Sequence, residues 1–328
     1  MEFHSSITTL PSLENCVVTI GSFDGMHYGH KQLIFQVQER SKALHVPSIL
    51  ITFQPHPKEV LLRDKEIPVE LLTTTEEKKE ILKNEFTIDH TVILPFTREF
   101  SQVRALEFLE TYIIQPFSPS EMVIGYDHSF GKGREGNADF LRRLESDYGY
   151  ITHVVEEVRL KNDETVSSSR IRSLLREGKT LEAARHLTRP YQVTGKVEQG
   201  EQRGREIGFP TANINISNTH KLLPRDGVYL VYVTGDDIQS YGMSNIGYRP
   251  TFDEHKHTLE VHLLNAPTDS LYGQHLTIHF FHRLRQEQEF GSAQALIEQL
   301  KQDKQQSQAI ITNENPWVQF QEEEITWL

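Results

Sequence analysis

The hydrophobic pattern of this chain changes its period near residue 190, and this change constrains the fold more than any other feature. Before it, short apolar runs alternate with amphipathic, helix-like segments, and the runs cover residues 16–20, 47–53, 90–96, 121–127 and 150–156. Apolar strands that alternate with amphipathic helices predict βαβ units around a parallel sheet, with right-handed crossovers. In such sheets ligands bind at the carboxyl ends of the strands.

After residue 190 the strands have period two and are separated by Gly, Pro, Asn and Asp turns, with no helix-like stretch between them. This pattern predicts an antiparallel sheet that curls into a small barrel. A final helix is expected near residues 291–305. Pro190 stops a helix where the period changes. We therefore expect an α/β fold: a Rossmann-like domain with a parallel sheet at residues 1–186, and an antiparallel β-barrel domain with a terminal helix at residues 187–328.

Composition limits the classes of protein that fit. A length of 328 residues suits two domains, and a hydrophobic fraction of 37% is typical of a globular chain. The net charge of −12 argues against nucleic acid or an anionic membrane as a partner, because both need a positive field. The sequence shows no membrane-spanning stretch and no signal peptide, and its single cysteine, Cys16, excludes an intramolecular disulfide. We expect a cytoplasmic protein; its oligomeric state is not indicated.

A glycine-rich loop follows the first of the long apolar runs. Gly21, Gly25 and Gly29 are spaced four apart. His27 and His30 lie within the same stretch, three residues apart at a helix start, so they would face the same side. A strand, then glycines, then a helix directs backbone N–H groups at phosphate oxygens, and two imidazole donors at the helix start can stabilise developing negative charge. The pattern H-x-G-H is used for nucleotidyl transfer. Taken alone, a tight turn with surface histidines explains this loop equally well.

A second polar segment lies at the far end of the same α/β half. Residues 166–178 contain three serines before a helical pattern, so Ser168 and Ser169 are expected to cap that helix. Their hydroxyl and N–H groups can also grip a phosphate, with Arg172 as a charged clamp. An ordinary helix cap with a surface arginine remains the alternative for this segment alone. The two segments together are more specific than either.

The motifs at residues 21–30 and 167–172 resemble those of the H-x-G-H nucleotidyltransferase superfamily. More narrowly, the half is similar to the FMN adenylyltransferase module of bacterial bifunctional riboflavin kinase/FAD synthetases. Further matching stretches are residues 52–57, 71–78, 94–100 and 125–137. The resemblance implies that the phosphate of FMN attacks the α-phosphorus of ATP and that pyrophosphate leaves, with Mg²⁺ bridging phosphates and no covalent enzyme intermediate.

The resemblance also implies roles for individual residues. Catalytic contacts with the ATP phosphates fall to His27 and His30. Residues that shape the loop against the nucleotide or hold its phosphates are Gly21, Phe23, Asp24, Gly25, Ser168, Ser169 and Arg172. Asp127 lies on the flavin-phosphate or metal side, or else caps a turn. Lys132 and Arg134 are either partners of the FMN phosphate or solvated loop charges, and His56 either supports the site or is a turn residue between two prolines.

A third informative stretch, residues 204–214, opens the barrel half. Gly204 and Gly208 flank a basic turn, and Thr211 and Asn213 lie two apart on an extended chain, so their side chains point the same way. Both offer hard oxygen ligands suited to Mg²⁺. Spacing alone favours a turn with an asparagine cap. The stretch resembles the riboflavin kinase signature, however, and residues 226–229, 245–252 and 259–265 match that family too. Gly204 and Gly208 would then lie at the ATP phosphates.

Residues 257–264 are read as a strand of period two. Leu259, Val261 and Leu263 share one face, and the opposite face carries Glu260. A glutamate on a polar face is usually only solvated, but the resemblance makes Glu260 the base that deprotonates the terminal ribityl hydroxyl. It also makes Arg249 a residue that binds the flavin or its phosphate, with a turn residue as the alternative. Met243 and the acidic tail after residue 312 depart from the family pattern without touching these roles.

The resemblance therefore predicts a flavin biosynthesis enzyme with two activities. The second half would phosphorylate riboflavin to FMN and the first would adenylylate FMN to FAD, with ATP as co-substrate and Mg²⁺ in both steps. One alternative is another H-x-G-H adenylyl- or cytidylyltransferase with a barrel that serves only for binding. Another is a flavin- or nucleotide-sensing regulator with decayed catalysis, which would lack residues such as His30 or Glu260, and both are present.

Overall fold

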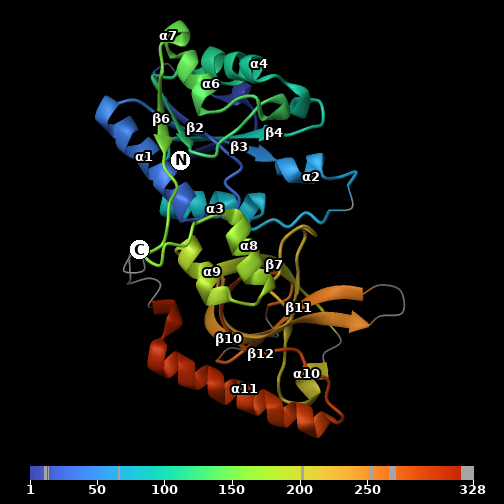
Figure 1. Ribbon diagram of the computed structural model, residues 1–328. Helices are drawn as coiled ribbons and strands as arrows, with labels where there is room; N and C mark the ends of the chain where they lie inside the picture. Colours follow the sequence, from blue (N-terminus) through green and yellow to red (C-terminus); the bar gives the residue numbers. More distant parts are fainter. Residues whose placement is uncertain are drawn as a thin grey trace. The chain divides into compact units, whose positions relative to one another are not determined.

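The computed structural model describes residues 1–328 except 11–12, 14, 66, 201–202, 251–254, 266–270 and 319–328. The chain forms two compact units, Met1–Val166 and Ser167–Leu328 (Figure 1). Helices α8 (Ser168–Arg176) and α9 (Thr180–Leu187) belong to the second unit. The predicted domain boundary after residue 186 lies at the end of α9, whereas the two compact units divide after Val166. The boundary between the two functional domains stays a prediction.

The first unit is built on a six-stranded sheet in the order β1-β4-β3-β2-β5-β6, with every neighbouring pair parallel. Its strands are β1 (Glu2–His4), β2 (Val17–Ile20), β3 (Ser48–Gln54), β4 (His90–Pro95), β5 (Glu121–Gly125) and β6 (Ile151–Val155). The strand order reverses direction between β2 and β5. Ligands of doubly wound sheets bind at this switch point, outside the carboxyl ends of the strands. The predicted Rossmann-like fold is confirmed.

Helices cover both faces of this sheet. They are α1 (Tyr28–Leu44), α2 (Pro57–Leu61), α3 (Thr75–Glu85), α4 (Ala105–Leu109), α5 (Gln115–Phe117), α6 (Ala138–Arg143) and α7 (Glu145–Tyr148). Because side chains alternate along a strand, Val18 of β2 packs with Phe108 of α4 and Leu141 of α6. Val17 faces the other way, toward α1 and α3. Figure 1 shows the two helical layers on opposite sides of the sheet.

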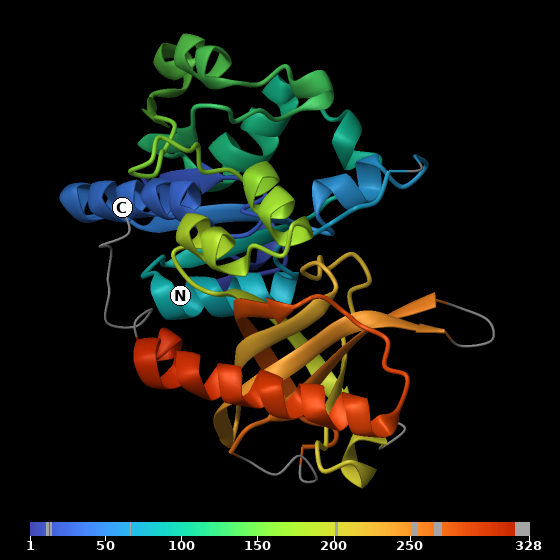
Figure 2. The ribbon, with the colours of Figure 1, turned by 60° about the horizontal axis from the view of Figure 1, so that its bottom comes forward.

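The second unit contains a closed antiparallel barrel in the order β10-β11-β8-β7-β12-β9. Its strands are β7 (Tyr191–Glu198), β8 (Ala212–Asn215), β9 (Gly227–Gly235), β10 (Ile238–Pro250), β11 (His255–Leu263) and β12 (His275–Arg285). Helix α9 packs on the barrel, where the hydroxyl of Thr180 donates to the carbonyl oxygen of Phe281. The terminal helix α11 (Ala293–Glu314) runs along the outside of the barrel (Figure 2). The predicted barrel and terminal helix are confirmed.

Several local expectations need correction. Strand β8 of the barrel was not predicted as a strand, and the short helix α10 (Arg203–Glu206) lies between β7 and β8, where no helix-like stretch was expected. Helix α8 is capped by Ser167, whose hydroxyl accepts from the N–H of Arg170 at 3.2 Å. Ser168 and Ser169, the expected caps, are already inside the first turn, because only Ser167 has the extended backbone that a cap requires.

Two candidate nucleotide sites

The glycine loop follows β2 directly, at the switch point of the sheet. Its start is held by the N–H of Gly21, which donates to the carbonyl oxygen of Ile51 at 3.0 Å. Three residues then adopt positive φ angles: 47° at Phe23, 87° at Gly25 and 45° at Met26. This left-handed path is unfavourable for residues with side chains, so the surrounding structure must hold it in place.

Asp24 supplies much of that hold. Its side chain is 2% exposed, and its Oδ1 accepts from the N–H groups of Leu72 and Thr73 at 2.9 and 3.1 Å. The Thr73 hydroxyl in turn accepts from the N–H of Gly25 at 3.0 Å. Asp24 therefore shapes the loop by fastening it to the segment that precedes α3, and this agrees with the loop-shaping role that the resemblance implies.

His27 and His30 lie together at the start of α1. His27 is the N-cap, and its Nδ1 accepts from the N–H of His30 at 3.4 Å. The two rings stack with centroids 3.6 Å apart, and Phe23 packs edge-on against His30. With Nδ1 acting as acceptor, a neutral His27 carries its proton on Nε2, where it can donate to a phosphate oxygen. The expectation that both histidines face one side is confirmed.

A buried lysine beneath the loop was missed by sequence reasoning. Lys78 of α3 is 5% exposed, and its Nζ donates to the carbonyl oxygen of Ser22 at 2.6 Å and to the Thr52 hydroxyl at 3.1 Å. Burial lowers its pKa to about 8, partly offset by the carboxylates of Asp24 and Glu59. Lys78 lies within one of the stretches that resemble the family, but its helical pattern alone does not distinguish it from its exposed neighbours.

The loop after β5 lies on the other side of the same switch point. Asp127 is exposed there, directly after the strand, and Lys132 and Arg134 are exposed further along. His128 between them is half-buried, and desolvation lowers its pKa to about 4. Asp127 is therefore placed where a ligand at the switch point could meet it, while the two basic residues keep both of their predicted alternatives.

The remaining predicted residues of this half lie in or next to helices α2 and α8. His56 is the N-cap of α2: its Nδ1 accepts from the N–H of Lys58 at 3.1 Å, and Glu59 accepts from its N–H at 2.7 Å. His56 therefore caps α2 in the turn between two prolines, and its support of the site stays a prediction. Ser168, Ser169 and the buried Arg172 lie in α8, within the second unit, and their predicted contact with the triphosphate stays a prediction.

The candidate site of the barrel is a row of polar side chains across paired strands. Asn213 of β8 lies directly opposite Glu260 of β11, and Glu260 lies opposite Asn245 of β10. The hydroxyl of Thr211, just before β8, donates to Glu260 Oε2 at 3.0 Å. Leu259, Val261 and Leu263 are buried on the other face, as the period-two pattern predicted. Two hard oxygen ligands and a carboxylate therefore meet on one half-buried face.

The turn before this row carries two of the predicted glycines. Gly204 lies in α10, where a Cβ would come within 2.3 Å of the carbonyl oxygen of Phe209. Gly208 has φ of 81°, a left-handed conformation that favours glycine. Arg249 belongs to β10 and pairs with Lys256, but its side chain lies outside the described part of the chain.

Other polar and charged residues near this row were not anticipated. Asn245 of β10 shares the face of Glu260. Glu287 lies close to Gly247 of β10, and desolvation raises the pKa of Glu287. His257 of β11 meets Asp226, with Nε2 and Oδ1 2.5 Å apart. Glu287 comes from the segment after β12, so only the closure of the barrel brings it to the row.

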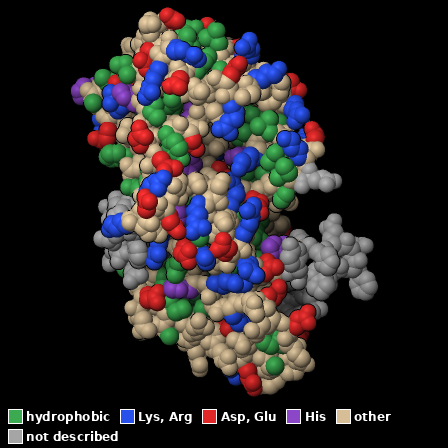
Figure 3. Space-filling view, viewed as in Figure 1, with side chains coloured by type: hydrophobic (Ala, Val, Ile, Leu, Met, Phe, Trp, Pro, Cys, Tyr) green, Lys and Arg blue, Asp and Glu red, His purple; other side chains and the backbone are tan. Residues whose placement is uncertain are grey.

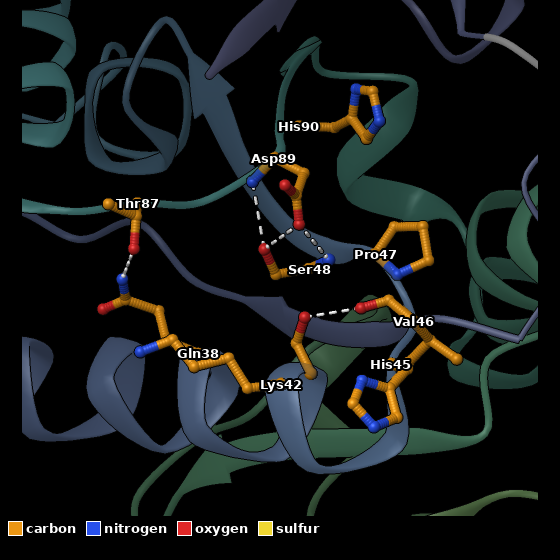
Figure 4. A pocket seen from close by; sticks show the side chains of 10 residues that line it. Gln38, Lys42, His45, Val46, Pro47, Ser48, Thr87, Asp89 and His90 are labelled. Atoms are coloured by element: carbon orange, nitrogen blue, oxygen red, sulfur yellow. Dashed lines mark hydrogen bonds between the residues drawn. The ribbon is translucent and has the colours of Figure 1, made fainter.

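A groove of about 730 Å³ lies elsewhere, near the amino ends of β3 and β4. Figure 4 shows its lining, in which Asp89 accepts from both the N–H and the hydroxyl of Ser48. Gln38, Lys42 and His45 line it from α1 and the turn that follows. None of the predicted site residues belongs to this lining, so the groove is separate from the candidate nucleotide sites.

The visible surface shows no segregation of charge. On the face drawn in Figure 3, basic and acidic side chains are intermingled. Among the described helices, none is long and apolar enough to cross a bilayer.

Comparison with known proteins covers both units. The family model described as FAD synthetase matches residues 9–170, and the one described as riboflavin kinase matches residues 187–311. The bifunctional riboflavin kinase/FMN adenylyltransferase of Escherichia coli K12 is 34% identical over 292 residues, which cover 88% of this chain and 91% of the relative. The protein of the same name from Listeria monocytogenes is 33% identical over 308 residues, covering 93% and 96%.

One solved structure is similar over nearly the whole length. It is described as a macrolide-efflux protein from Streptococcus pneumoniae, and it shares 28% identity with a TM-score of 0.82 over 94% of this chain and 98% of its own. The two matching family models and the relatives with both activities in one chain lead to the same assignment. The chain belongs to the family of bifunctional riboflavin kinase/FMN adenylyltransferases.

Proposed function

We propose that the chain converts riboflavin to FMN at the row formed by Thr211, Asn213 and Glu260, and converts FMN to FAD at the loop that follows β2. ATP supplies the phosphoryl group in the first reaction and the adenylyl group in the second. The proposal rests on the meeting of a hydroxyl, an amide and a carboxylate on one face of β8 and β11. A purely structural barrel does not require this combination.

In the kinase reaction, Glu260 accepts the proton of the terminal ribityl hydroxyl, the oxygen attacks the γ-phosphorus of ATP, and ADP leaves. The hydrogen bond from Thr211 to Glu260 Oε2 fixes the orientation of the carboxylate. Thr211 and Asn213 are the residues that would hold Mg²⁺, because hydroxyl and amide oxygens are hard ligands of the kind it prefers. When bound, Mg²⁺ would neutralise charge on the phosphates. Gly204 and Gly208 give the adjoining turn its path, and Arg249 stays a proposed flavin ligand.

In the adenylyltransferase reaction, a phosphate oxygen of FMN attacks the α-phosphorus of ATP and pyrophosphate leaves. His27 and His30 donate to phosphate oxygens as their negative charge grows, and the backbone between Gly21 and Gly25 lines the approach. Asp127 meets the flavin-phosphate or metal side. The triphosphate contacts of Ser168, Ser169 and Arg172, the use of Mg²⁺ and a cytoplasmic location are parts of the same proposal.

The assignment of residues is tested by separating flavins chromatographically after incubation with Mg-ATP. Glu260→Ala should lower FMN formation from riboflavin by about 10²- to 10⁴-fold, the usual contribution of a general base, and should spare FAD formation from FMN. His30→Ala should have the opposite selectivity, with FAD formation reduced by about 10²- to 10³-fold. If either variant lost both activities while remaining folded by circular dichroism, the assignment of one reaction to each site would be wrong.

A further inference from the structure

Three potential metal ligands meet at the edge of the parallel sheet, away from both candidate nucleotide sites. Strand β1 pairs in parallel with β4, with Glu2 opposite His90 and His4 opposite Val92. Since side chains alternate along a strand, Glu2 and His4 lie on one face of β1. His90 is the first residue of β4, so the three side chains gather at the amino end of that strand.

The distances between their ligand atoms are short. His4 Nε2 and His90 Nδ1 are 3.3 Å apart, and Glu2 Oε2 lies 3.7 Å from the first and 3.4 Å from the second. Among the residues that the structure describes, these are the one group of three or more His, Cys, Asp or Glu whose ligand atoms lie within 4.8 Å of one another.

These distances match those of a tetrahedral zinc site. Zinc binds imidazole nitrogen at about 2.0–2.1 Å and carboxylate oxygen at about 2.0–2.2 Å, so two ligands of a tetrahedral ion lie roughly 3.3–3.5 Å apart. The separations of 3.3 and 3.4 Å fall in this range, and the third, 3.7 Å, is slightly wider. A small movement of the exposed Glu2 side chain would close it.

A simple hydrogen bond between the two histidines explains less. An N–H donor and its acceptor usually lie about 2.9–3.0 Å apart, whereas these nitrogens are 3.3 Å apart. A hydrogen bond between the two histidines also does not account for the approach of Glu2 to both nitrogens. The side chains of His4 and His90 are only 10% and 14% exposed, so both imidazoles are largely shielded from water.

We propose that Glu2, His4 and His90 form a site for a divalent transition-metal ion of the Zn²⁺ type, with water in the remaining position. Two imidazoles and one carboxylate suit zinc, whereas Mg²⁺ prefers oxygen ligands, so this site is chemically distinct from the magnesium chemistry of the reactions. Three protein ligands and an open fourth position are typical of accessible zinc sites.

The surroundings provide access to solvent. His90 also lines the groove shown in Figure 4, and the Glu2 side chain is 68% exposed. Asp89, next to His90, is engaged with Ser48, which fixes the backbone at this point. The site lies at the amino end of β4, whereas the glycine loop follows the carboxyl end of β2, at the opposite end of the sheet. A bound ion would therefore fasten the three-residue strand β1 to β4.

The test is a titration of the untagged, full-length protein with Co²⁺ in the presence of excess Mg²⁺. Mg²⁺ occupies oxygen-rich nucleotide sites, and tetrahedral Co²⁺ is detected by its intense visible absorption. We expect one equivalent of Co²⁺ to bind, Zn²⁺ to displace it, and Zn²⁺ to raise the unfolding temperature. His4→Gln and His90→Gln should weaken binding by more than the roughly 10- to 100-fold that loss of an outer hydrogen-bond partner costs.

A matched control separates this site from general histidine binding. His275 is an exposed histidine of β12, and His275→Gln should leave the Co²⁺ titration and the Zn²⁺-induced rise in unfolding temperature unchanged. If His90→Gln failed to fold, His4→Gln and Glu2→Gln on the edge strand would still decide the question. Wild-type affinity in these variants, or no tetrahedral Co²⁺ signal in the wild-type protein, would overturn the proposal.

Discussion

In the first unit the candidate site is a backbone loop, whereas in the second it is a row of side chains on paired strands. The loop takes positive φ angles at Phe23, Gly25 and Met26. Two contacts hold it: Asp24 accepts from the N–H of Leu72, and Lys78 donates to the carbonyl oxygen of Ser22. The row depends on register, because Asn213 and Glu260 face each other only in the observed pairing. A slip of one residue would turn every side chain to the opposite face of the strand.

The difference indicates what each site tolerates. A loop site should be sensitive to the groups that brace its backbone, even where those groups never reach a substrate. A strand site should be sensitive to the polar atoms within the row and less sensitive to polar neighbours of the same type. Three predictions, in order of expected effect, can break or sharpen this comparison.

The largest effect is expected in the barrel row. Thr211→Val keeps the shape of the side chain but removes the hydroxyl that donates to Glu260. FMN formation should fall by more than the roughly 10- to 100-fold that loss of an outer hydrogen-bond partner costs, because Thr211 is itself a proposed ligand of Mg²⁺, while FAD formation from FMN should be unchanged. Steady-state rates of both reactions measure this.

Thr258→Val is the matched control for that substitution. Thr258 lies two residues from Glu260 on the same strand, and its hydroxyl donates to the carbonyl oxygen of Gly247 at 3.2 Å. Its replacement should affect FMN formation far less than Thr211→Val. Equal losses in the two variants would mean that the face responds to any lost hydroxyl, and the special role of the row would be refuted.

A smaller effect is expected below the loop. Lys78→Met removes the donor to the Ser22 carbonyl oxygen and leaves that acceptor buried without this bond, which typically costs about 1–3 kcal/mol. The free energy of unfolding of the first unit should fall accordingly, and FAD formation should weaken while FMN formation persists. Lys83→Met, on the exposed side of the same helix, should stay within about 0.5 kcal/mol of the wild type. If denaturant unfolding showed equal changes in both variants, Lys78 would not brace the loop.

The smallest effect concerns acid stability and compares one histidine of lowered pKa in each unit. Burial lowers the pKa of His279 to about 3 and that of His128 to about 4, from an ordinary value of 6.5. Between these values and 6.5 the unfolded chain binds a proton that the folded chain does not, so stability falls as the pH falls through this window. His279→Phe and His128→Phe should each make that fall shallower.

Denaturant unfolding between pH 7 and pH 4 measures the slope for each variant. Each substitution also removes other contacts, such as the 2.9 Å hydrogen bond between Thr234 and His279, so the comparison concerns the slope with pH and not the stability at pH 7. His275→Phe, which changes an exposed histidine, should keep the wild-type slope. An unchanged slope in His279→Phe and His128→Phe would show that protonation of these two histidines is not linked to folding.

Much of this molecule could be predicted from local patterns. The alternation of apolar runs and helices located five strands of the parallel sheet, and it placed the glycine loop after β2. The period of two on β11 correctly separated Leu259 from Glu260, and the helical spacing of His27 and His30 correctly put the two rings on one side. Each of these features depends on residues a few positions apart, so the sequence carries it directly.

Short elements escaped prediction because they carry too few residues for a period to appear. Strand β1 has three residues and β8 has four, and β8 is recognised only through its pairing with β7 and β11. Likewise, the choice of Ser167 over Ser168 as the helix cap depended on backbone geometry at one residue, which three consecutive serines do not disclose.

What the sequence determined by itself is the two-part architecture and, where a period is clear, the face of an element on which a residue such as Leu259 or Glu260 lies. The tertiary structure alone decided which distant residues meet: Lys78 with Ser22, Asp24 with Leu72, Glu2 and His4 with His90, and Thr211 with Glu260. The physical reason is range. Periodicity records how a residue relates to its own element, whereas pairing, register and burial are settled only when the elements close around a common core.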